Sequence, residues 1–364
     1  MMRMIRGHGS SPSRSTTTTS LQCRRSALIL SWLLVLIMGT TSCVTTVNGL
    51  TAEVPSAAKK PSTMVVYGDQ YKYLPLIVSK IAAKRGIKTY CICGTGTETN
   101  CRRILYGEEY AKLEKDDDDK VQPISSPDDM QVALQAADCM VLVGNEEPLD
   151  SKTISTLVNI ASEKDADTKD ENFVPLSKIV LLSKMGATKK GGGGFFGGGG
   201  GGKDAAILQS ETFLRDKAKE KGLDLAIVRA GVVVKGGGPG DADPETGLTH
   251  DFGLNRFVYT KFLDVVEATV AMAHDRYTLG ADVTAGDKYG TESPPNMLQI
   301  MGTKSSFEEV PYETNRIVAG EAVVAALYQL YENDQGKPID FSVSTKKGRA
   351  PPTPEEWSEL LKNL

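Results

Sequence analysis

The sequence predicts an α/β domain built on a doubly wound parallel sheet over residues 64–364. Met64–Gly68 is a short apolar run that ends in glycine, and Ile87–Cys93 is a second run, rich in β-branched and aromatic residues. The segment between the two runs has apolar residues at helical spacing: Leu76, Ile77, Ile81 and Ala82. Strand, helix and strand in this order form a βαβ unit, whose right-handed crossover makes the two strands parallel.

The alternation of helix and strand continues towards the C-terminus, which favours one α/β domain. Strands are predicted where apolar residues run together, and helices where they recur every three or four residues. Capped helices are expected to begin at Ser126 or Asp128 and at Thr353. The other predicted strands are Cys139–Val143, Ser177–Ser183, Leu223–Gly231 and Ile339–Thr345, and the other predicted helices are Leu157–Lys164, Ala205–Gly222 and Asn315–Asn333.

Three segments interrupt this pattern. Arg102–Lys120 is charged and ends in KDDDDK, which predicts a surface loop or the end of a helix. Lys189–Lys203 is so rich in glycine that we expect a flexible loop. Residues 236–311 are rich in turn residues, with one helix predicted over Phe262–His274. We expect this variable segment to form the substrate side of the domain.

Residues 1–50 differ from the body and predict a signal peptide. They contain five arginines and no acidic residue, and Arg24 and Arg25 precede the apolar stretch Ala27–Gly39. A basic segment followed by an apolar stretch of this length is typical of secretory signal peptides. The stretch is short for a transmembrane helix, so no stable membrane span is expected after leader removal. An uncleaved signal anchor is the alternative.

Residues 51–63 have the composition of a transit-like linker, with Ser, Ala, Thr and Lys and a single acid at Glu53. A signal peptide followed by such a segment resembles the bipartite presequences of algae with complex plastids. The aromatic residue of those presequences is replaced here by Leu50. Import into a plastid is therefore one hypothesis, and a secreted or endomembrane lumenal protein is the other.

Composition argues against a nucleic-acid partner, a disulfide scaffold and a zinc site. After the leader, 37 basic side chains face 46 acidic ones, a net charge of −9, which argues against a nucleic-acid partner. The body has four cysteines, too few for a disulfide scaffold, and no Cys/His spacing predicts a zinc site. Cys91, Cys93 and Cys101 would suit a redox or metal site, although buried cysteines more often act as small apolar residues.

The turn after the first strand carries the predicted cofactor site. In dinucleotide-binding Rossmann folds this turn is rich in glycine, so that backbone N–H groups approach the pyrophosphate. Gly68 keeps the first glycine and is followed by Asp69 and Gln70, which we assign to the cofactor site with it. Tyr71 and Leu74 replace the later glycines, so a turn that no longer binds cofactor is equally consistent with the sequence.

The segment after the second strand bears on the choice between NAD and NADP. It has no acidic residue before Glu98 to read the ribose hydroxyls of NAD. Arg102 and Arg103 are candidates to bind the additional phosphate of NADP, which favours NADP without excluding NAD. Two exposed arginines on a helix would explain the pattern equally well.

Several segments together resemble the atypical short-chain dehydrogenase/reductases of the NmrA-like, NAD(P)-binding type. SPDDMQVALQAADCMVLVG is similar to the family's helix and fourth strand, SKIVLLSKMGA to the strand that ends at the active-site serine, and ETFLRDKAKEKGLDLAIVRAG and NRIVAGEAVVAAL to later family segments. The resemblance implies a Rossmann-like domain, a catalytic position for Ser183, and structural positions for Arg229, Gly231 and Arg316.

One departure from the family decides the predicted function. Catalytic members use a Tyr-x-x-x-Lys pair to exchange a proton with the substrate carbonyl. No such pair follows Ser183, where Phe195, Phe196 and polyglycine stand. The sequence therefore predicts an NAD(P)-binding protein with a divergent site, acting as an unconventional reductase or a redox sensor on an undefined small molecule.

Two other functions are consistent with the sequence. A conventional NADP-dependent oxidoreductase would need a tyrosine from the variable segment, such as Tyr259 or Tyr289. A Rossmann scaffold without cofactor would bind protein partners instead.

Overall fold

The computed structural model describes residues 60–68, 73–108, 121–145, 147–163, 174–188, 201–231, 236–237, 253–255, 278–288, 313–333 and 338–364. All of them belong to one compact unit, Ser56–Leu364. Several features of the sequence lie outside the described residues: the leader, Asp69, Gln70, Tyr71, the KDDDDK segment, residues 189–200, Tyr259, Tyr289 and the helix predicted over Phe262–His274.

The described strands form one sheet in the order β3-β2-β1-β4-β5-β6-β8-β7. Strands β1 to β6 and β8 run parallel, and β7 pairs antiparallel with β8 at the edge. The first six strands have the 3-2-1-4-5-6 order of the dinucleotide-binding Rossmann fold, which confirms the predicted fold class. The strands are β1 Thr63–Gly68, β2 Lys88–Ile92, β3 Gln122–Ile124, β4 Cys139–Val143, β5 Lys178–Lys184, β6 Asp224–Ala230, β7 Gly280–Ala285 and β8 Ile339–Lys346.

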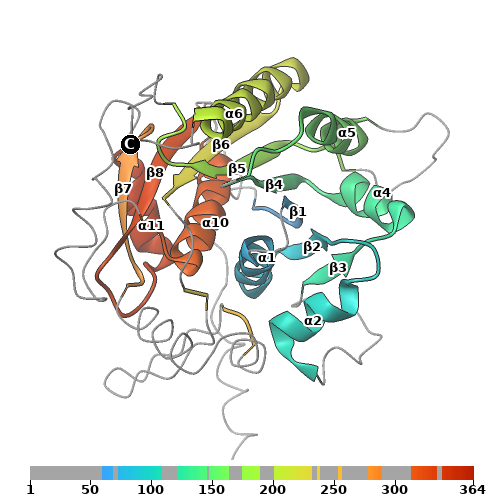
Figure 1. Cartoon of the computed structure of the whole chain (residues 1–364), viewed down its shortest axis with the longest axis horizontal. Helices are drawn as coiled ribbons and strands as arrows, with labels where there is room; N and C mark the ends of the chain where they lie inside the picture. Colours follow the sequence, from blue (N-terminus) through green and yellow to red (C-terminus); the bar gives the residue numbers. More distant parts are fainter. Residues whose placement is uncertain are drawn as a thin grey trace, which may run out of the picture. The chain divides into compact units, whose positions relative to one another are not determined.

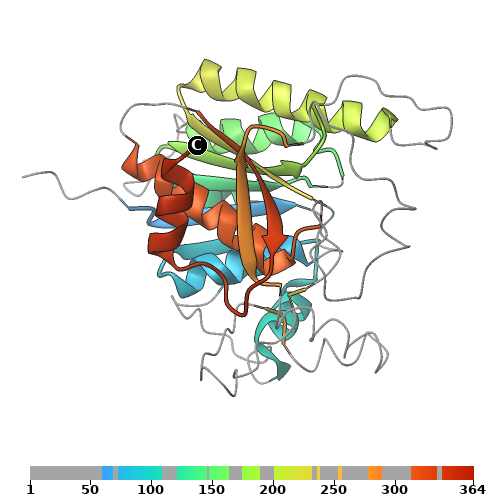
Figure 2. The same ribbon diagram turned by 90° about the vertical axis from the view of Figure 1, so that its left-hand side faces the viewer.

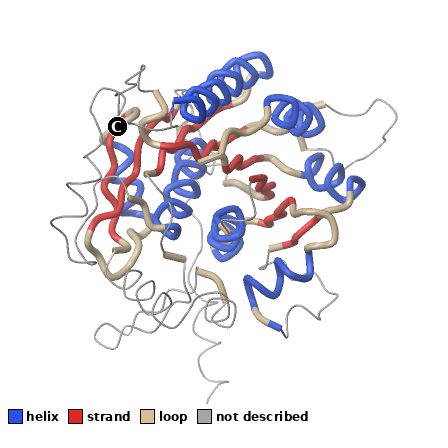
Figure 3. Tube along the Cα trace, viewed as in Figure 1, coloured by secondary structure: helices blue, strands red, loops and turns tan. Residues whose placement is uncertain are grey.

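Helices cover both faces of the sheet (Figures 1 and 3). The helices are α1 Leu74–Lys84, α2 Glu98–Tyr106, α4 Pro127–Ala136, α5 Ser151–Ser162, α6 Gly201–Lys221, α10 Arg316–Glu332 and α11 Pro354–Lys362. Helices α4, α5 and α6 lie on one face, and α1 and α10 on the other (Figure 1). In Figure 2, α11 lies beside α10, and β7 beside β8. Within the described part of the chain, no helix combines the length and apolar character needed to cross a bilayer.

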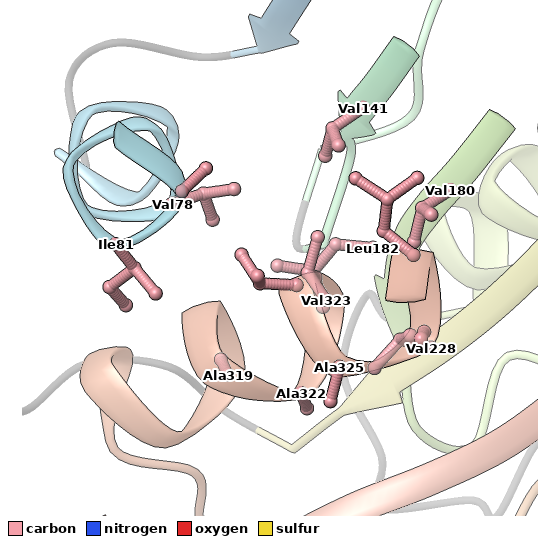
Figure 4. Close-up of a cluster of buried hydrophobic side chains, with 14 of the residues drawn as sticks. Val78, Ile81, Val141, Val180, Leu182, Val228, Ala319, Ala322, Val323 and Ala325 are labelled. Atoms are coloured by element: carbon pink, nitrogen blue, oxygen red, sulfur yellow. The ribbon is translucent and has the colours of Figure 1, made fainter. Parts of the chain in front are cut away.

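Alternate residues of each central strand feed two separate cores. In β5, Val180 and Leu182 face α1 and α10, whereas Ile179 and Leu181 face α5 and α6. Because both faces are buried, the strands are continuous apolar runs rather than alternating ones. Figure 4 shows the first core, in which Val78 of α1 and Val323 of α10 point towards the valines of β4, β5 and β6.

Helices α1 and α10 approach each other closely at Gly320. A Cβ atom there would be 2.7 Å from Ile81 Cδ1, a distance at which one side chain must move. The absence of a side chain lets the two helices share the apolar layer over β1 and β4. Capping fixes where several helices begin: Ser126, Asp150, Asn315 and Thr353 each accept a backbone N–H hydrogen bond from the first turn.

Several elements of the structure were not predicted from the sequence, or begin at other residues than predicted. Strand β3 is three residues long and includes Pro123. Strand β7 lies inside residues 236–311, the segment expected to be variable. Both are edge strands, where few apolar residues are needed and proline is tolerated. Helix α6 begins at Gly201, inside the segment expected to be a loop, and α2 occupies the start of the charged segment.

A buried carboxyl group lies between α10 and α1. The Glu321 side chain is fully buried and pairs with Arg85 at the end of α1, while its Oε1 atom has no hydrogen-bond partner among the described residues. Burial raises the pKa of Glu321 from 4.5 to about 7, although the Arg85 charge lowers it. The folded chain therefore binds this proton more tightly than the unfolded chain does.

We predict that Glu321→Gln removes part of the pH dependence of stability. Because the folded-state pKa is raised, the wild-type chain loses stability as pH rises from the ordinary carboxyl pKa through about 7. Between about pH 5 and pH 8 this loss amounts to about 2 kcal/mol, and the glutamine variant does not show it. Urea unfolding at several pH values measures the difference, with the exposed Glu332→Gln as control. Parallel curves for wild type and Glu321→Gln would contradict the prediction.

Candidate functional site

The candidate site lies at the carboxyl edge of the sheet, between β1 and β4. The strand order reverses at this point, and open α/β sheets bind ligands in the crevice outside it. Gly68 is the last residue of β1 and pairs in register with Val143, the last residue of β4. The loops that follow these two strands therefore leave the sheet side by side.

Gly68 stands at a position with no room for a side chain. A Cβ atom would be 2.5 Å from the Val143 carbonyl oxygen, 2.7 Å from Val143 Cβ and 3.1 Å from Pro75 Cγ. Glycine is thus required for β1, β4 and the start of α1 to converge. The structure places Gly68 at the switch point, and its assignment to the cofactor site stays a prediction.

The start of α1 differs from a glycine-rich turn in two ways. Tyr73 caps the helix with φ 56° and ψ 0°, a left-handed conformation that costs a non-glycine residue about 1 kcal/mol or more. Pro75 lies in the first turn and has no N–H group, so one backbone donor for an anion is missing. Leu74, at one of the expected glycine positions, is 3% exposed and belongs to the core.

Asn145 follows β4 at the same edge and was not predicted. Its side chain is 4% exposed, and neither the amide nitrogen nor the amide oxygen has a hydrogen-bond partner. Among the described residues with unpartnered buried atoms, Asn145 is the one with two such atoms. An unsatisfied buried polar group costs about 1–3 kcal/mol, so this amide is suited to a ligand that supplies both a donor and an acceptor.

The turn after β2 is held by its own polar groups. Thr97 Oγ1 donates to the Gly94 carbonyl oxygen at 2.6 Å, and the Gly96 N–H group donates to Ser125 Oγ at 3.3 Å. The Ser125 hydroxyl in turn donates to the Glu98 carboxylate. In this fold the end of β2 lies where the adenosine ribose binds, so these groups define the far end of the site.

The two arginines assigned to the cofactor phosphate lie on α2. Arg103 is 2.7 Å from Glu108 Oε1 through Nε, and its Nη1 donates to Asn100 Oδ1 at 2.9 Å. Arg102 is half-buried on the same helix. The Arg103 guanidinium is therefore already engaged by one residue of α2 and by Glu108 just after it, and the role of both arginines in binding NADP stays a prediction.

Ser183, expected at the catalytic position, belongs to a buried network of charges. Its side chain is 1% exposed, and its hydroxyl donates to Glu211 Oε1 at 2.5 Å. Arg229 of β6 binds Glu211 through two nitrogens, at 2.7 and 3.1 Å, and also pairs with Asp340 of β8. Arg215 of α6 contacts Asp340 at 2.5 Å.

The network stabilises the charged form of its central arginine. Burial alone would lower the pKa of Arg229, but its pairing with Glu211 and Asp340 raises that pKa above the ordinary value. Two carboxylates around one buried guanidinium satisfy its charge and hydrogen bonds. Ser183 completes this arrangement from β5 and has no described tyrosine as a hydrogen-bond partner. Its catalytic role stays a prediction.

The described residues contain no group of three or more His, Cys, Asp or Glu side chains able to hold a metal ion. Cys139 of β4 lies apart from Cys91, Cys93 and Cys101, and its thiol donates to the Thr63 carbonyl oxygen at 3.4 Å.

Comparison with known proteins gives matches at the level of structure. No family model matches the chain, and no curated protein matches its sequence. Similar solved structures include a short-chain dehydrogenase/reductase from Veillonella parvula, with 12% identity, a TM-score of 0.40 and coverage of 80% of this chain and 99% of that one. The oxidoreductase YlbE from Lactococcus lactis has 13% identity, a TM-score of 0.38 and coverage of 83% and 96%.

A third similar structure is a UDP-N-acetylglucosamine 4-epimerase from Methanobrevibacter ruminantium, with 11% identity, a TM-score of 0.38 and coverage of 79% of each chain. Likeness of this degree carries no information about activity. The strand order of the sheet itself identifies the fold.

We predict that Ser183→Ala lowers the free energy of unfolding by about 2 kcal/mol, because a buried carboxylate loses a hydrogen bond. Thr212→Ala is the matched control, since Thr212 neighbours Glu211 on α6 but is exposed and donates only to the Leu208 carbonyl oxygen of its own helix. Guanidinium unfolding measures both variants. Equal losses in the two would contradict a special role for the Ser183 hydrogen bond.

Proposed function

We propose that this chain binds a nicotinamide dinucleotide at the switch point between β1 and β4. The observation that carries the proposal is the buried Asn145 amide, whose donor and acceptor both lack a partner. A nucleotide carries complementary groups, because its ribose hydroxyls and its carboxamide both donate and accept hydrogen bonds. The strand order and the side-chain-free position at Gly68 support the same location.

The residues at this edge fit such a cofactor in part. Asn145 would bind the nicotinamide half, the N–H groups of Leu74 and Leu76 at the start of α1 would face the pyrophosphate, and the turn Gly94–Thr97 would border the adenosine ribose. When bound, the cofactor supplies a hydride acceptor or donor. Pro75 removes one N–H group from the pyrophosphate site, so we expect weaker binding than a glycine-rich turn gives.

We further propose that the cofactor serves an unconventional reduction or a sensing role. The Ser183 hydroxyl is committed to Glu211, and the segment after it lacks the tyrosine and lysine pair that transfers a proton in the family. A conventional oxidoreductase would need another acid beside the substrate. The commitment of Ser183 to Glu211 therefore favours an unconventional reduction or a sensing role over a conventional oxidoreductase.

The test is a titration of the full chain with NADPH, NADH, NADP and NAD. Thermal stabilisation should grow as RT ln(1 + [L]/Kd), which is about 2.7 kcal/mol at a hundredfold excess over Kd. A larger thermal shift with NADPH or NADP than with NADH or NAD would support the prediction that Arg102 binds the additional phosphate of NADP. No shift with any nucleotide at millimolar concentration would contradict the proposal and favour a scaffold that binds protein partners.

We predict that Asn145→Leu separates stability from binding. Removing an unsatisfied buried amide should stabilise the ligand-free chain by about 1–3 kcal/mol, while nucleotide affinity falls by about tenfold or more. Calorimetric titration and thermal unfolding measure the two effects.

Ser162→Ala is the matched control. Its hydroxyl is also buried without a partner, but it is the last residue of α5, which runs back to the opposite edge of the sheet. This variant should keep the wild-type affinity. Unchanged affinity in Asn145→Leu would exclude Asn145 from the nucleotide site.

A further inference from the structure

Three cysteine thiols gather where β2 meets α2. Cys91 lies in β2, Cys93 directly follows it, and Cys101 lies in the first turns of α2. Their side chains are 0%, 8% and 4% exposed. They share a small apolar cluster with Leu76, Ala83, Leu105 and Val121. The cysteines of the described residues form no disulfide.

Two of these thiols are in direct contact. The Cys93 thiol donates a hydrogen bond to Cys101, and the two sulfur atoms are 3.1 Å apart. A disulfide S–S bond is about 2.05 Å long, so a closing movement of about 1 Å would join them. The turn Gly94–Thr97 separates them along the chain, and a short turn can absorb such a movement.

The two thiols differ in acidity. The hydrogen bond from Cys93 lowers the pKa of Cys101 below its ordinary value, against the burial that raises it. The same hydrogen bond raises the pKa of Cys93. Cys101 is therefore the more acidic of the two thiols, and because the thiolate is the nucleophilic form of cysteine, we assign the first attack to Cys101.

Cys139 provides the contrast within the same chain. Its side chain is fully buried in β4, and desolvation raises the pKa of its thiol well above the ordinary value. Its thiol donates to the Thr63 carbonyl oxygen and forms no disulfide with another described cysteine. Burial and the neighbouring Asp138 both raise this pKa, so Cys139 serves as the control for the Cys93–Cys101 pair.

We propose that Cys93 and Cys101 form a reversible disulfide, and that its formation regulates the nucleotide site. The first part stands on the geometry of the two sulfurs. The second part rests on the proposed function, because the turn between the cysteines borders the expected ribose position.

Hydrogen peroxide is the oxidant in this scheme. The Cys101 thiolate attacks one peroxide oxygen, the O–O bond breaks, and hydroxide leaves and takes a proton to become water. The resulting sulfenic acid is attacked by Cys93 sulfur, the S–O bond breaks, and the Cys93 proton leaves with the hydroxyl as a second water. Two thiols are oxidised to one disulfide while one peroxide is reduced to two waters, and an external dithiol reverses the reaction.

Closing the disulfide should weaken nucleotide binding. Drawing Cys101 towards Cys93 pulls the first turn of α2 towards the end of β2. The turn Gly94–Thr97 must narrow at the same time. Two hydrogen bonds hold this turn, one from Thr97 to the Gly94 carbonyl oxygen and one from Gly96 to Ser125. We expect affinity to fall by about tenfold, within the usual range of coupling between two sites.

The first experiment maps the disulfide in the wild-type full chain. Reduced protein is treated with hydrogen peroxide, its remaining thiols are alkylated, and trypsin releases Thr89–Arg102, which contains all three cysteines. We expect a peptide that has lost two hydrogens and carries one alkyl group, on Cys91. A peptide alkylated at all three cysteines, or a bond that uses Cys91, would overturn the assignment.

Variants then test the two roles. Cys93→Ser should leave Cys101 trapped as sulfenic acid, detected by a dimedone probe, whereas Cys101→Ser should leave Cys93 unlabelled. Cys139→Ser is the control and should form the disulfide as the wild type does. Labelling of Cys93 in Cys101→Ser would overturn the order of attack.

The regulatory part is tested by comparing nucleotide affinity before and after oxidation, with Cys93→Ser treated in parallel. A tenfold loss in the wild type alone supports it, and equal affinity in both states overturns it. If no nucleotide binds the reduced chain, the proposed function fails, while the peptide map decides the disulfide separately.

Discussion

The backbone contact at Gly68 is the constraint on which the carboxyl edge of the sheet between β1 and β4 depends. β1 and β4 are neighbouring inner strands, and α1 must start immediately above them for its apolar face to cover the sheet. A side chain at Gly68 would overlap the Val143 carbonyl oxygen and displace α1. The fold can therefore place the start of α1 and the end of β4 side by side only with glycine here.

The buried polar side chains Arg229, Glu321 and Asn145 have three different surroundings. Arg229 is enclosed by two carboxylates and Ser183, so its charge is fully compensated. Glu321 pairs with one cation and keeps one carboxylate oxygen without a partner, and burial raises its pKa to about 7. The side-chain amide of Asn145 has no hydrogen-bond partner, although it is nearly as buried. The first arrangement satisfies its own charges, whereas the last leaves a donor and an acceptor for the proposed nucleotide.

The sequence predicted most of the fold because burial on both sheet faces leaves continuous apolar runs. β4 matches its predicted bounds, and α4, α10 and α11 begin at the capping residues that the sequence offers. β3 and β7 escaped prediction because an edge strand carries no continuous apolar run. The start of α6 escaped because glycine gives no helical signal.

The site was less predictable than the fold. The sequence pointed to Gly68 because a glycine after an apolar run has a direct steric meaning, and its role in binding cofactor stays a prediction. Asn145 gave one signal, a polar residue just after a buried strand, which many loops share. The commitment of Ser183 to Glu211 depends on a contact between β5 and α6, 28 residues apart in the chain. Pairings of that kind follow from the packed structure, and no local pattern predicts them.

Hydrogen exchange with and without saturating NADPH shows whether the nucleotide binds between β1 and β4. We expect slower exchange in two peptides, one covering Gly68 to the first turn of α1 and one covering Gly144–Leu149, with little change in α11. Protection of this kind would place the nucleotide at the switch point between β1 and β4. Unchanged exchange in both peptides at saturation, or protection confined to another part of the chain, would contradict it.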